Sequence, residues 1–148
     1  MKKELKDALL ANIEKFLLEL GRGFAYVGRE YRLSIGGDDY YIDLLFYNLN
    51  LRSYVVVEVK TGKMEPEAVG QLGLYVQAVD ETLKKSWDNK SIGILICKTK
   101  NEVLARYALK MVNAPIGISD YQLTPLVPES LQSDLPSVED LEKELNKK

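Results

Sequence analysis

The spacing of apolar residues along the chain changes after residue 20. Over residues 3–20, apolar side chains recur every three or four positions, which is typical of an amphipathic helix. Gly21 and Gly23 follow directly, and glycine commonly ends a helix. The chain is therefore expected to begin with one long helix that buries one face.

Residues 24–60 follow a shorter period and are rich in Tyr, Val, Ile and Leu. Two polar stretches, residues 36–39 and 48–50, contain the Gly, Asp and Asn residues that favour tight turns. Strands joined by tight turns form an antiparallel meander. We expect three such strands, near residues 31–35, 40–47 and 53–60.

The second half of the chain alternates helices and strands. Pro66 suits the first turn of a helix, and a proline, Pro115, also follows the second predicted helix. A strand, a helix and a further strand in succession predict a parallel crossover unit. The fold class is therefore α/β with a mixed sheet, its later elements being a helix at 66–83, a strand at 91–98, a helix at 102–112 and a weaker strand at 116–121.

The length of 148 residues fits a single domain of ordinary size. Residues 1–122 contain all the elements predicted above. Residues 123–148 hold three prolines, which indicates an extended connection over the surface. Ser137 is a candidate cap for a final helix, and we expect this segment to pack on the domain or extend from it.

The composition excludes several kinds of catalytic site. The chain has no histidine and one cysteine, so it holds no Ser-His-Asp triad, no Cys-His pair and no four-ligand Cys/His zinc site. A formal net charge of -2 gives no strong indication of a nucleic-acid partner. No apolar run is long enough to span a membrane and no signal peptide is evident, so we expect a cytoplasmic protein.

Three charged residues stand out in the predicted strands. Asp43 lies in an otherwise apolar and aromatic run, and Glu58 and Lys60 end the next strand. A carboxylate in such a strand is costly unless it is paired or coordinates a cation. Strand alternation places Glu58 and Lys60 on one face. If the two strands are antiparallel neighbours, Asp43 lies beside Glu58.

This group of residues has a natural chemical use. Two carboxylates and a backbone carbonyl, such as that of Val59, form the oxygen-rich shell that Mg²⁺ prefers. Such an ion acidifies a bound water and offsets charge on a phosphoryl group. Lys60 would orient or deprotonate that water and stabilise the developing negative charge. The pattern predicts metal-assisted hydrolysis of a phosphodiester, which needs no histidine.

Further candidates lie on the two helices that flank the predicted meander. Gln71 and Tyr75 are four residues apart and share a helix face, where they would orient Lys60 or contact a phosphate. Glu19 is a candidate for an additional carboxylate at the metal. Glu14 competes with it, because the two cannot face the sheet equally well.

The order of Asp43, Glu58, Lys60, Gln71 and Tyr75 resembles the D…ExK…QxxxY pattern of the PD-(D/E)XK nuclease superfamily. The restriction-endonuclease-like core of that superfamily is a helix, three strands, a helix and a fourth strand, which matches the predicted order. The present chain would add a helix, a strand and a C-terminal helix to it.

Residues 16–21, 41–47 and 91–98 are more closely similar to the C-terminal domain of YhcG-type proteins, within a likeness that covers about residues 5–145. In one respect the chain departs from the superfamily pattern, since Ile42 stands where a proline often precedes the first acid. The resemblance implies a role for each candidate residue: metal-binding acids (Asp43, Glu58), a catalytic lysine (Lys60), a helix acid (Glu19) and a supporting pair (Gln71, Tyr75).

The resemblance also implies an activity and partners. We expect an endonuclease domain that hydrolyses DNA phosphodiesters, duplex or branched, with Mg²⁺ or Mn²⁺. YhcG-type proteins usually carry an N-terminal domain associated with DNA binding, so this chain is either an excised domain or a short relative. Two alternatives stay open: a catalytically silent module that binds nucleic acid or a protein, and an assembly domain of a longer protein that forms homodimers.

Other candidate features have simpler structural interpretations. Cys97 closes an apolar strand and is expected to be buried. Several strand aromatics could stack on bases, but packing within the fold accounts for most of them. Five lysines could form a phosphate-facing patch, although charge clusters are usually solvated faces: Lys84, Lys85, Lys90, Lys98 and Lys100.

Overall fold

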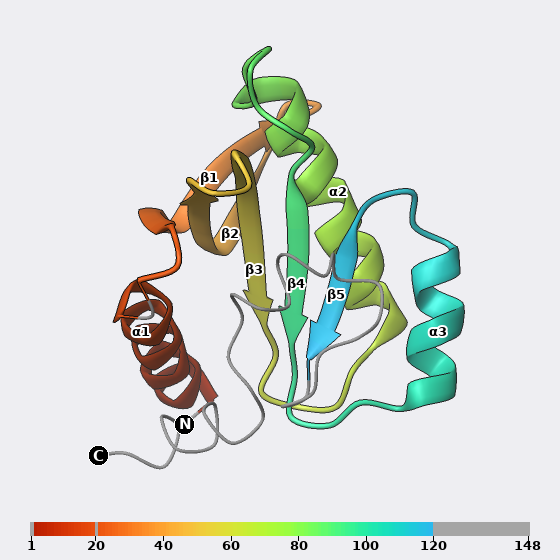
Figure 1. Cartoon of the computed structure of the whole chain (residues 1–148). Coiled ribbons are helices and arrows are strands. Elements are labelled where there is room, and N and C mark those ends of the chain that lie inside the picture. The colour runs from red at the N-terminus through yellow and green to blue at the C-terminus, as the bar shows by residue number, and fades with distance from the viewer. Residues whose placement is uncertain (1, 20, 120–148) are drawn as a thin grey trace.

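The structure of the chain is a computed structural model that describes residues 2–19 and 21–119. Three helices and five strands occupy this part of the chain (Figure 1). In chain order they are α1 (Lys2–Glu19), β1 (Phe24–Ile35), β2 (Asp38–Asn48), β3 (Ser53–Val59), α2 (Pro66–Thr82), β4 (Ile92–Ile96), α3 (Glu102–Lys110) and β5 (Ile116–Ser119). The final helix predicted near Ser137 lies outside the described residues.

The strands form one mixed sheet in the order β1-β2-β3-β4-β5. β1, β2 and β3 pair antiparallel, as expected of strands joined by tight turns. β3, β4 and β5 run parallel to one another, because α2 and α3 carry the chain back between them. The predicted meander and crossover unit are both confirmed.

Helices cover both faces of this sheet. α1 packs on one face, whereas α2 and α3 lie together on the other (Figure 1). β3 is buried on both sides, since Val55 and Val57 contact the α1 core and Val56 contacts the α2 core. This double burial explains the continuous apolar run in its sequence. Each fully buried Val stabilises the fold by roughly 1.5–3 kcal/mol, which helps offset the cost of holding charged groups at the end of the same strand.

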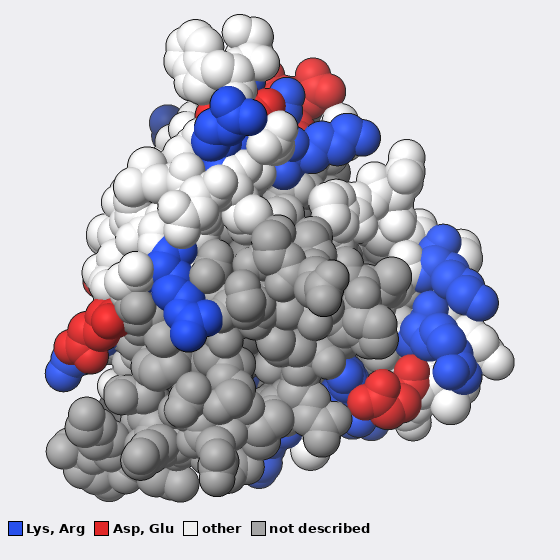
Figure 2. Space-filling model, viewed as in Figure 1, with Lys and Arg blue, Asp and Glu red and all other residues white. Residues whose placement is uncertain are grey.

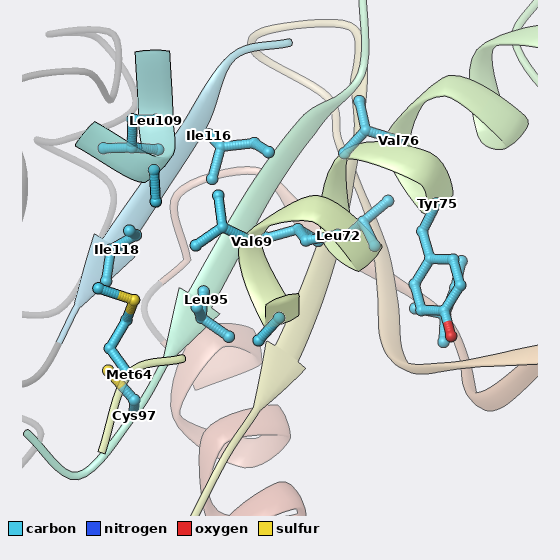
Figure 3. Packing of buried hydrophobic residues seen from close by; sticks show 14 of the residues in the cluster. Met64, Val69, Leu72, Tyr75, Val76, Leu95, Cys97, Leu109, Ile116 and Ile118 are labelled. Carbon is cyan, nitrogen blue, oxygen red and sulfur yellow. The ribbon is translucent and has the colours of Figure 1, made fainter. Parts of the chain in front are cut away.

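The core on the α2 side is the larger of the two. Figure 3 shows Val69, Leu72 and Val76 of α2 facing Leu95 of β4 and Ile116 of β5. Cys97, which directly follows β4, is 2% exposed in the same core, so its predicted burial is confirmed. The core residues from the three elements on this face interlock: Val69, Leu72, Val76 and Val79 from α2, Ala105, Ala108 and Leu109 from α3, and Leu45, Val56, Leu95, Ile116 and Ile118 from the sheet.

One element is longer than the sequence predicts. β1 begins at Phe24 rather than near residue 31. Its pairing register with β2 shifts between Tyr26 and Gly28, and Glu30 takes a positive φ of 48°. These irregularities interrupt the alternation of inward and outward side chains, so the period-two pattern is obscured. The other described elements agree with the predicted bounds to within about two residues, the usual uncertainty of helix and strand ends.

None of the helices in the described part of the chain is both long and apolar enough to cross a lipid bilayer. The five lysines considered above as a candidate patch are divided by the fold. Lys84, Lys85 and Lys90 precede β4, whereas Lys98 and Lys100 follow it, so the two groups lie at opposite ends of that strand. Figure 2 shows basic side chains in separate groups, with acidic ones among them.

Candidate active site

The site lies where the pairing of β2 with β3 ends. The ladder runs from Asn48 and Ser53 to Leu44 and Val57. One step further along this register, Asp43 stands opposite Glu58. Beyond Leu44, backbone N–H groups donate to carboxylate side chains instead of backbone carbonyls. The sequence prediction that Asp43 lies beside Glu58 depends on this antiparallel pairing.

Backbone N–H groups hold both carboxylates. The Asp43 N–H donates to Glu58 Oε2 at 2.7 Å, and the Val59 N–H donates to Asp43 Oδ2 at 2.8 Å. Asp43 is 8% exposed and Glu58 is 4% exposed. Charge-assisted bonds to the backbone are strong and fix the side-chain rotamers. Each carboxylate therefore has one oxygen tied to the sheet and one remaining oxygen.

The remaining oxygen of Asp43 has a partner that the sequence prediction missed. Lys6 on α1 places its Nζ 3.0 Å from Asp43 Oδ1. A signal was present in the sequence, because Lys6 precedes Leu10, Ile13 and Leu17 at spacings of four, three and four residues. A lysine on the apolar stripe of a helix indicates a buried or half-buried partner.

Glu58 is the most perturbed carboxyl group of the site. Burial, and then the negative charge of Asp43, raise the pKa of Glu58 from 4.5 to about 7. The bond from the Asp43 N–H and the positive charges of Lys60 and Lys6 oppose this shift without cancelling it. At neutral pH the carboxyl group is therefore poised between its two protonation states. A further cation nearby would favour the ionised form.

Tyr75 of α2 lies close enough to this pair to sense both charges. The side chain is 4% exposed and its ring packs edge-on against Tyr40, with centroids 6.0 Å apart. Burial, and then the charges of Glu58 and Asp43, raise the pKa of Tyr75. The hydroxyl therefore stays protonated and available as a donor. Figure 3 shows the ring at the margin of the α2 core, away from Leu109 and Ile118.

Lys60 and Gln71 line a common cavity of about 550 Å³. The Lys60 N–H donates to Ile96 O at 2.8 Å, which anchors the end of β3 to β4. Gln71 is exposed on the first half of α2. Strand alternation places Glu58 and Lys60 on the α2 face, the face that Val56 also occupies.

The structure thus brings Asp43, Glu58, Lys60, Gln71 and Tyr75 to one end of the sheet. Direct hydrogen bonds connect the first two residues, and the other three lie on the α2 face. The cavity is lined by Lys60, Thr61, Gly62, Lys63, Glu65, Glu67, Ala68 and Gln71.

Glu19 does not join this group, contrary to the expected helix acid. Its carboxylate is exposed and lies 4.0 Å from Lys15. The side chain is 13 positions beyond Lys6 on one continuous helix, or about 20 Å along the axis. Glu14 also points elsewhere, with Oε1 3.4 Å from Arg29 of β1.

The donor chemistry of the site fits a hard divalent cation. Two carboxylates, each with one oxygen free of the backbone, are oxygen ligands of the kind that Mg²⁺ and Mn²⁺ take. A cationic group already lies at Asp43 Oδ1, so this position accepts positive charge. Among the residues whose side chains the structure describes, no cluster of three acidic or cysteine side chains forms. Carbonyl, water and phosphate oxygens are suitable further ligands for such an ion.

Comparison with known proteins assigns the chain to a family. The family described as the YhcG PDDEXK nuclease domain matches residues 1–136. The chain belongs to this nuclease family. It is also 33% identical over 120 residues to the "Putative nuclease YhcG" of Escherichia coli (strain K12). The matched region covers 81% of the chain but only 32% of that relative, so this YhcG PDDEXK nuclease domain spans about a third of the longer protein.

A solved structure shares the fold of this nuclease domain, and a second one matches it with a lower score. The "Structure of EndoMS-dsDNA2 complex" matches with a TM-score of 0.51 and 24% identity, over 74% of the chain and 44% of the other. The "crystal structure of a repair endonuclease from Pyrococcus abyssi" matches with a TM-score of 0.48 and 21% identity, over 68% of the chain and 42% of the other. The first likeness agrees with the restriction-endonuclease-like core expected from the sequence.

Proposed function

We propose that this chain is the catalytic domain of a divalent-metal-dependent endonuclease that hydrolyses phosphodiester bonds of DNA. Membership of a nuclease family supports a hydrolase that acts on nucleic acid. The observation that carries the proposal is the pair of carboxylates, Asp43 of β2 and Glu58 of β3, held by backbone N–H groups and accompanied by Lys60 directly after β3.

The proposed ligands of the metal are the carboxylates of Asp43 and Glu58 and the carbonyl of Val59. A bound Mg²⁺ or Mn²⁺ supplies a water of lowered pKa and positive charge beside the phosphoryl group. The protein's part is to fix the ligands, which the two backbone N–H bonds do. Because the carboxylates are preorganised, little of the binding energy is needed to arrange them.

Lys60, Gln71 and Tyr75 have proposed roles around this centre. Lys60 orients the attacking water and stabilises the negative charge that develops on the phosphoryl oxygens. The amide of Gln71, in the same cavity, positions the Lys60 ammonium or donates to a phosphate oxygen. The protonated hydroxyl of Tyr75 acts as a donor beside the two carboxylates.

DNA is the proposed substrate. A protein of similar fold has been solved with double-stranded DNA, which makes duplex DNA the first substrate to test. On the face seen in Figure 2, the described basic side chains form separate groups rather than one continuous patch. We therefore propose that target selection is shared with the remainder of a longer protein, such as an N-terminal DNA-binding domain, or with a second copy of the chain.

Cleavage assays with matched variants test the proposal. Purified protein is incubated with duplex, nicked, branched and single-stranded DNA and with RNA, in Mg²⁺, Mn²⁺ or EDTA. Loss of a metal ligand or of the catalytic lysine should lower the cleavage rate by at least about 100-fold. Three pairs of variants compare a proposed site residue with an exposed residue of the same type. They are Asp43→Asn with Asp39→Asn, Lys60→Ala with Lys110→Ala, and Gln71→Ala with Gln77→Ala.

The result that would overturn the proposal is equally specific. Cleavage that survives in Asp43→Asn and Lys60→Ala at the wild-type rate would come from a contaminant or another site. If the wild type cuts none of these substrates but binds DNA, the chain is a nucleic-acid-binding module of nuclease fold. If the protein cleaves RNA alone, the proposed site residues stand and the proposed substrate changes from DNA to RNA.

A further inference from the structure

Lys6 is a charged residue of the site to which the proposed function gives no role. It lies on the face of α1 that packs against the sheet, in line with Leu10, Ile13 and Leu17, each of which is at most 3% exposed. The Lys6 side chain itself is 33% exposed. At one end of this apolar stripe, the Lys6 ammonium therefore extends from the helix to the carboxylate pair.

The oxygen that Lys6 contacts is the one a metal would need. The Val59 N–H holds Asp43 Oδ2, so Oδ1 is the oxygen left for another ligand, and the Lys6 ammonium lies 3.0 Å from it. On Glu58, the Asp43 N–H holds Oε2. Among the described residues, no hydrogen bond reaches Glu58 Oε1. Of the described side chains, the Lys6 ammonium is thus the cation bound directly to a free oxygen of the pair.

We propose that Lys6 and the divalent ion compete for Asp43 Oδ1, so that Lys6 is a built-in counter-ion that sets the metal affinity of the site. The inference rests on the proposed metal site. An ammonium and a divalent ion cannot share one carboxylate oxygen without strong repulsion at such short separation. Lys6 must leave Oδ1 when the ion binds.

The side chain of Lys6 is suited to this exchange. Lysine carries a compact charge on a flexible four-carbon stem, and one third of this side chain is already in contact with solvent. Its ammonium can therefore move into water without disturbing α1, whose hold on the sheet depends on Leu10, Ile13 and Leu17. In the metal-free protein the same ammonium offsets charge on two buried carboxyl groups, which would otherwise repel each other.

A purely structural ion pair makes a different prediction from a competing counter-ion. If Lys6 only stabilises the fold, its removal lowers the stability and leaves the metal affinity unchanged or weaker. If Lys6 competes with the metal, its removal tightens metal binding. Metal affinity, measured without DNA and without turnover, therefore separates the two roles.

The test compares the Mn²⁺ affinities of variants of the whole 148-residue chain by calorimetry or by electron paramagnetic resonance. Lys6→Met should bind Mn²⁺ about fivefold or more tightly than the wild type, the lower end of a usual coupling between two sites. Lys6→Arg keeps the charge and should stay near the wild type. The matched control is Lys15→Met on the same helix, whose lysine is 63% exposed and pairs with Glu19.

Each outcome decides the question. Equal or weaker Mn²⁺ binding by Lys6→Met than by Lys15→Met overturns the competition. Should Lys6→Met fail to fold, judged by circular dichroism, Lys6→Gln provides the same comparison with a polar side chain. Asp43→Asn locates the bound ion: if the wild type binds Mn²⁺ and Asp43→Asn does not, the metal site stands even where the competition fails. If neither the wild type nor Lys6→Met binds Mn²⁺, both the metal site and the competition are wrong.

Discussion

Glu58 is a residue whose ionisation couples the site to the stability of the fold. Its pKa is raised from 4.5 to about 7 in the folded protein, first by burial and then by the charge of Asp43. Between these two values the folded state binds more protons than the unfolded chain. The contribution of this group to stability is therefore fully present below about pH 4.5 and is lost as the pH rises to about 7.

Replacing Glu58 with glutamine should remove the cost of ionising this buried carboxyl group at high pH. In EDTA at pH 8, we expect Glu58→Gln to be more stable than the wild type by up to about 3 kcal/mol, since a pKa shift of this size corresponds to that free energy. Near pH 4 the difference should vanish. Urea unfolding from pH 4 to 8 measures it, with the exposed Glu81→Gln as control. A difference that is constant over this range would show that ionisation of Glu58 is not its cause.

The residues of the site differ in how far the sequence reveals them. Asp43 and Glu58 are conspicuous because each is a carboxylate within an apolar strand. Lys6 escaped prediction because a lysine on a helix is usually solvated, and only its alignment with Leu10 and Ile13 marks it. Glu19 lies away from the pair in the structure, and its place in the motif order does not tell how far along the helix axis it lies.

At the scale of elements, the packing of α2 on β4 sets where the site can form. A Cβ at Gly93 of β4 would lie 2.9 Å from Leu72 Cγ and 2.9 Å from Val76 Cγ2. A residue without a side chain is therefore needed for α2 to approach the sheet this closely. The same helix carries Gln71 and Tyr75, so its distance from the sheet also governs their distance from β3.

A pair of glycine substitutions tests this interpretation. Gly93→Ala should destabilise the protein by about 1–3 kcal/mol, the usual cost of overpacking a core. Gly70→Ala, on the exposed face of α2 with no atom within 4 Å of the new methyl group, should stabilise it by up to about 1 kcal/mol, because alanine favours a helix over glycine. Chemical denaturation of both variants gives the comparison. A neutral Gly93→Ala would mean that α2 and β4 can separate freely at this point.

The order and type of the elements were predictable because the pattern of apolar residues in them is clear. Apolar residues recur every three to four positions in α1 and α2, and they form continuous runs in β3 and β4. β1 was predicted too short for a physical reason. Among the described strands it pairs only with β2, and most of its side chains are partly or fully exposed. The irregularities at Val27 and Glu30 also break its alternation. The sequence of an edge strand of this kind shows little alternation of apolar and polar residues.

At the scale of the whole molecule, the site is held by three parts of the sequence that lie far apart. α1 supplies Lys6, the β2–β3 pair supplies Asp43 and Glu58, and α2 supplies Tyr75. The helices contact opposite faces of the sheet, so the carboxylate pair connects the two cores. Long-range placement of this kind follows from the sheet register and cannot be derived from local patterns alone. A ligand that binds the pair should therefore stabilise the entire domain.

Metal binding should accordingly raise the melting temperature of the protein. At a Mn²⁺ concentration about 100 times the dissociation constant, a ligand specific for the folded state adds about 2.7 kcal/mol of stability. For a chain of this length that corresponds to a rise of about 5–10 °C. Asp43→Asn should show no such rise, because it lacks one of the two carboxylates, whereas Asp39→Asn should behave as the wild type. Differential scanning calorimetry in EDTA and in Mn²⁺ measures all three, and an equal rise in wild type and Asp43→Asn would place the ion elsewhere on the molecule.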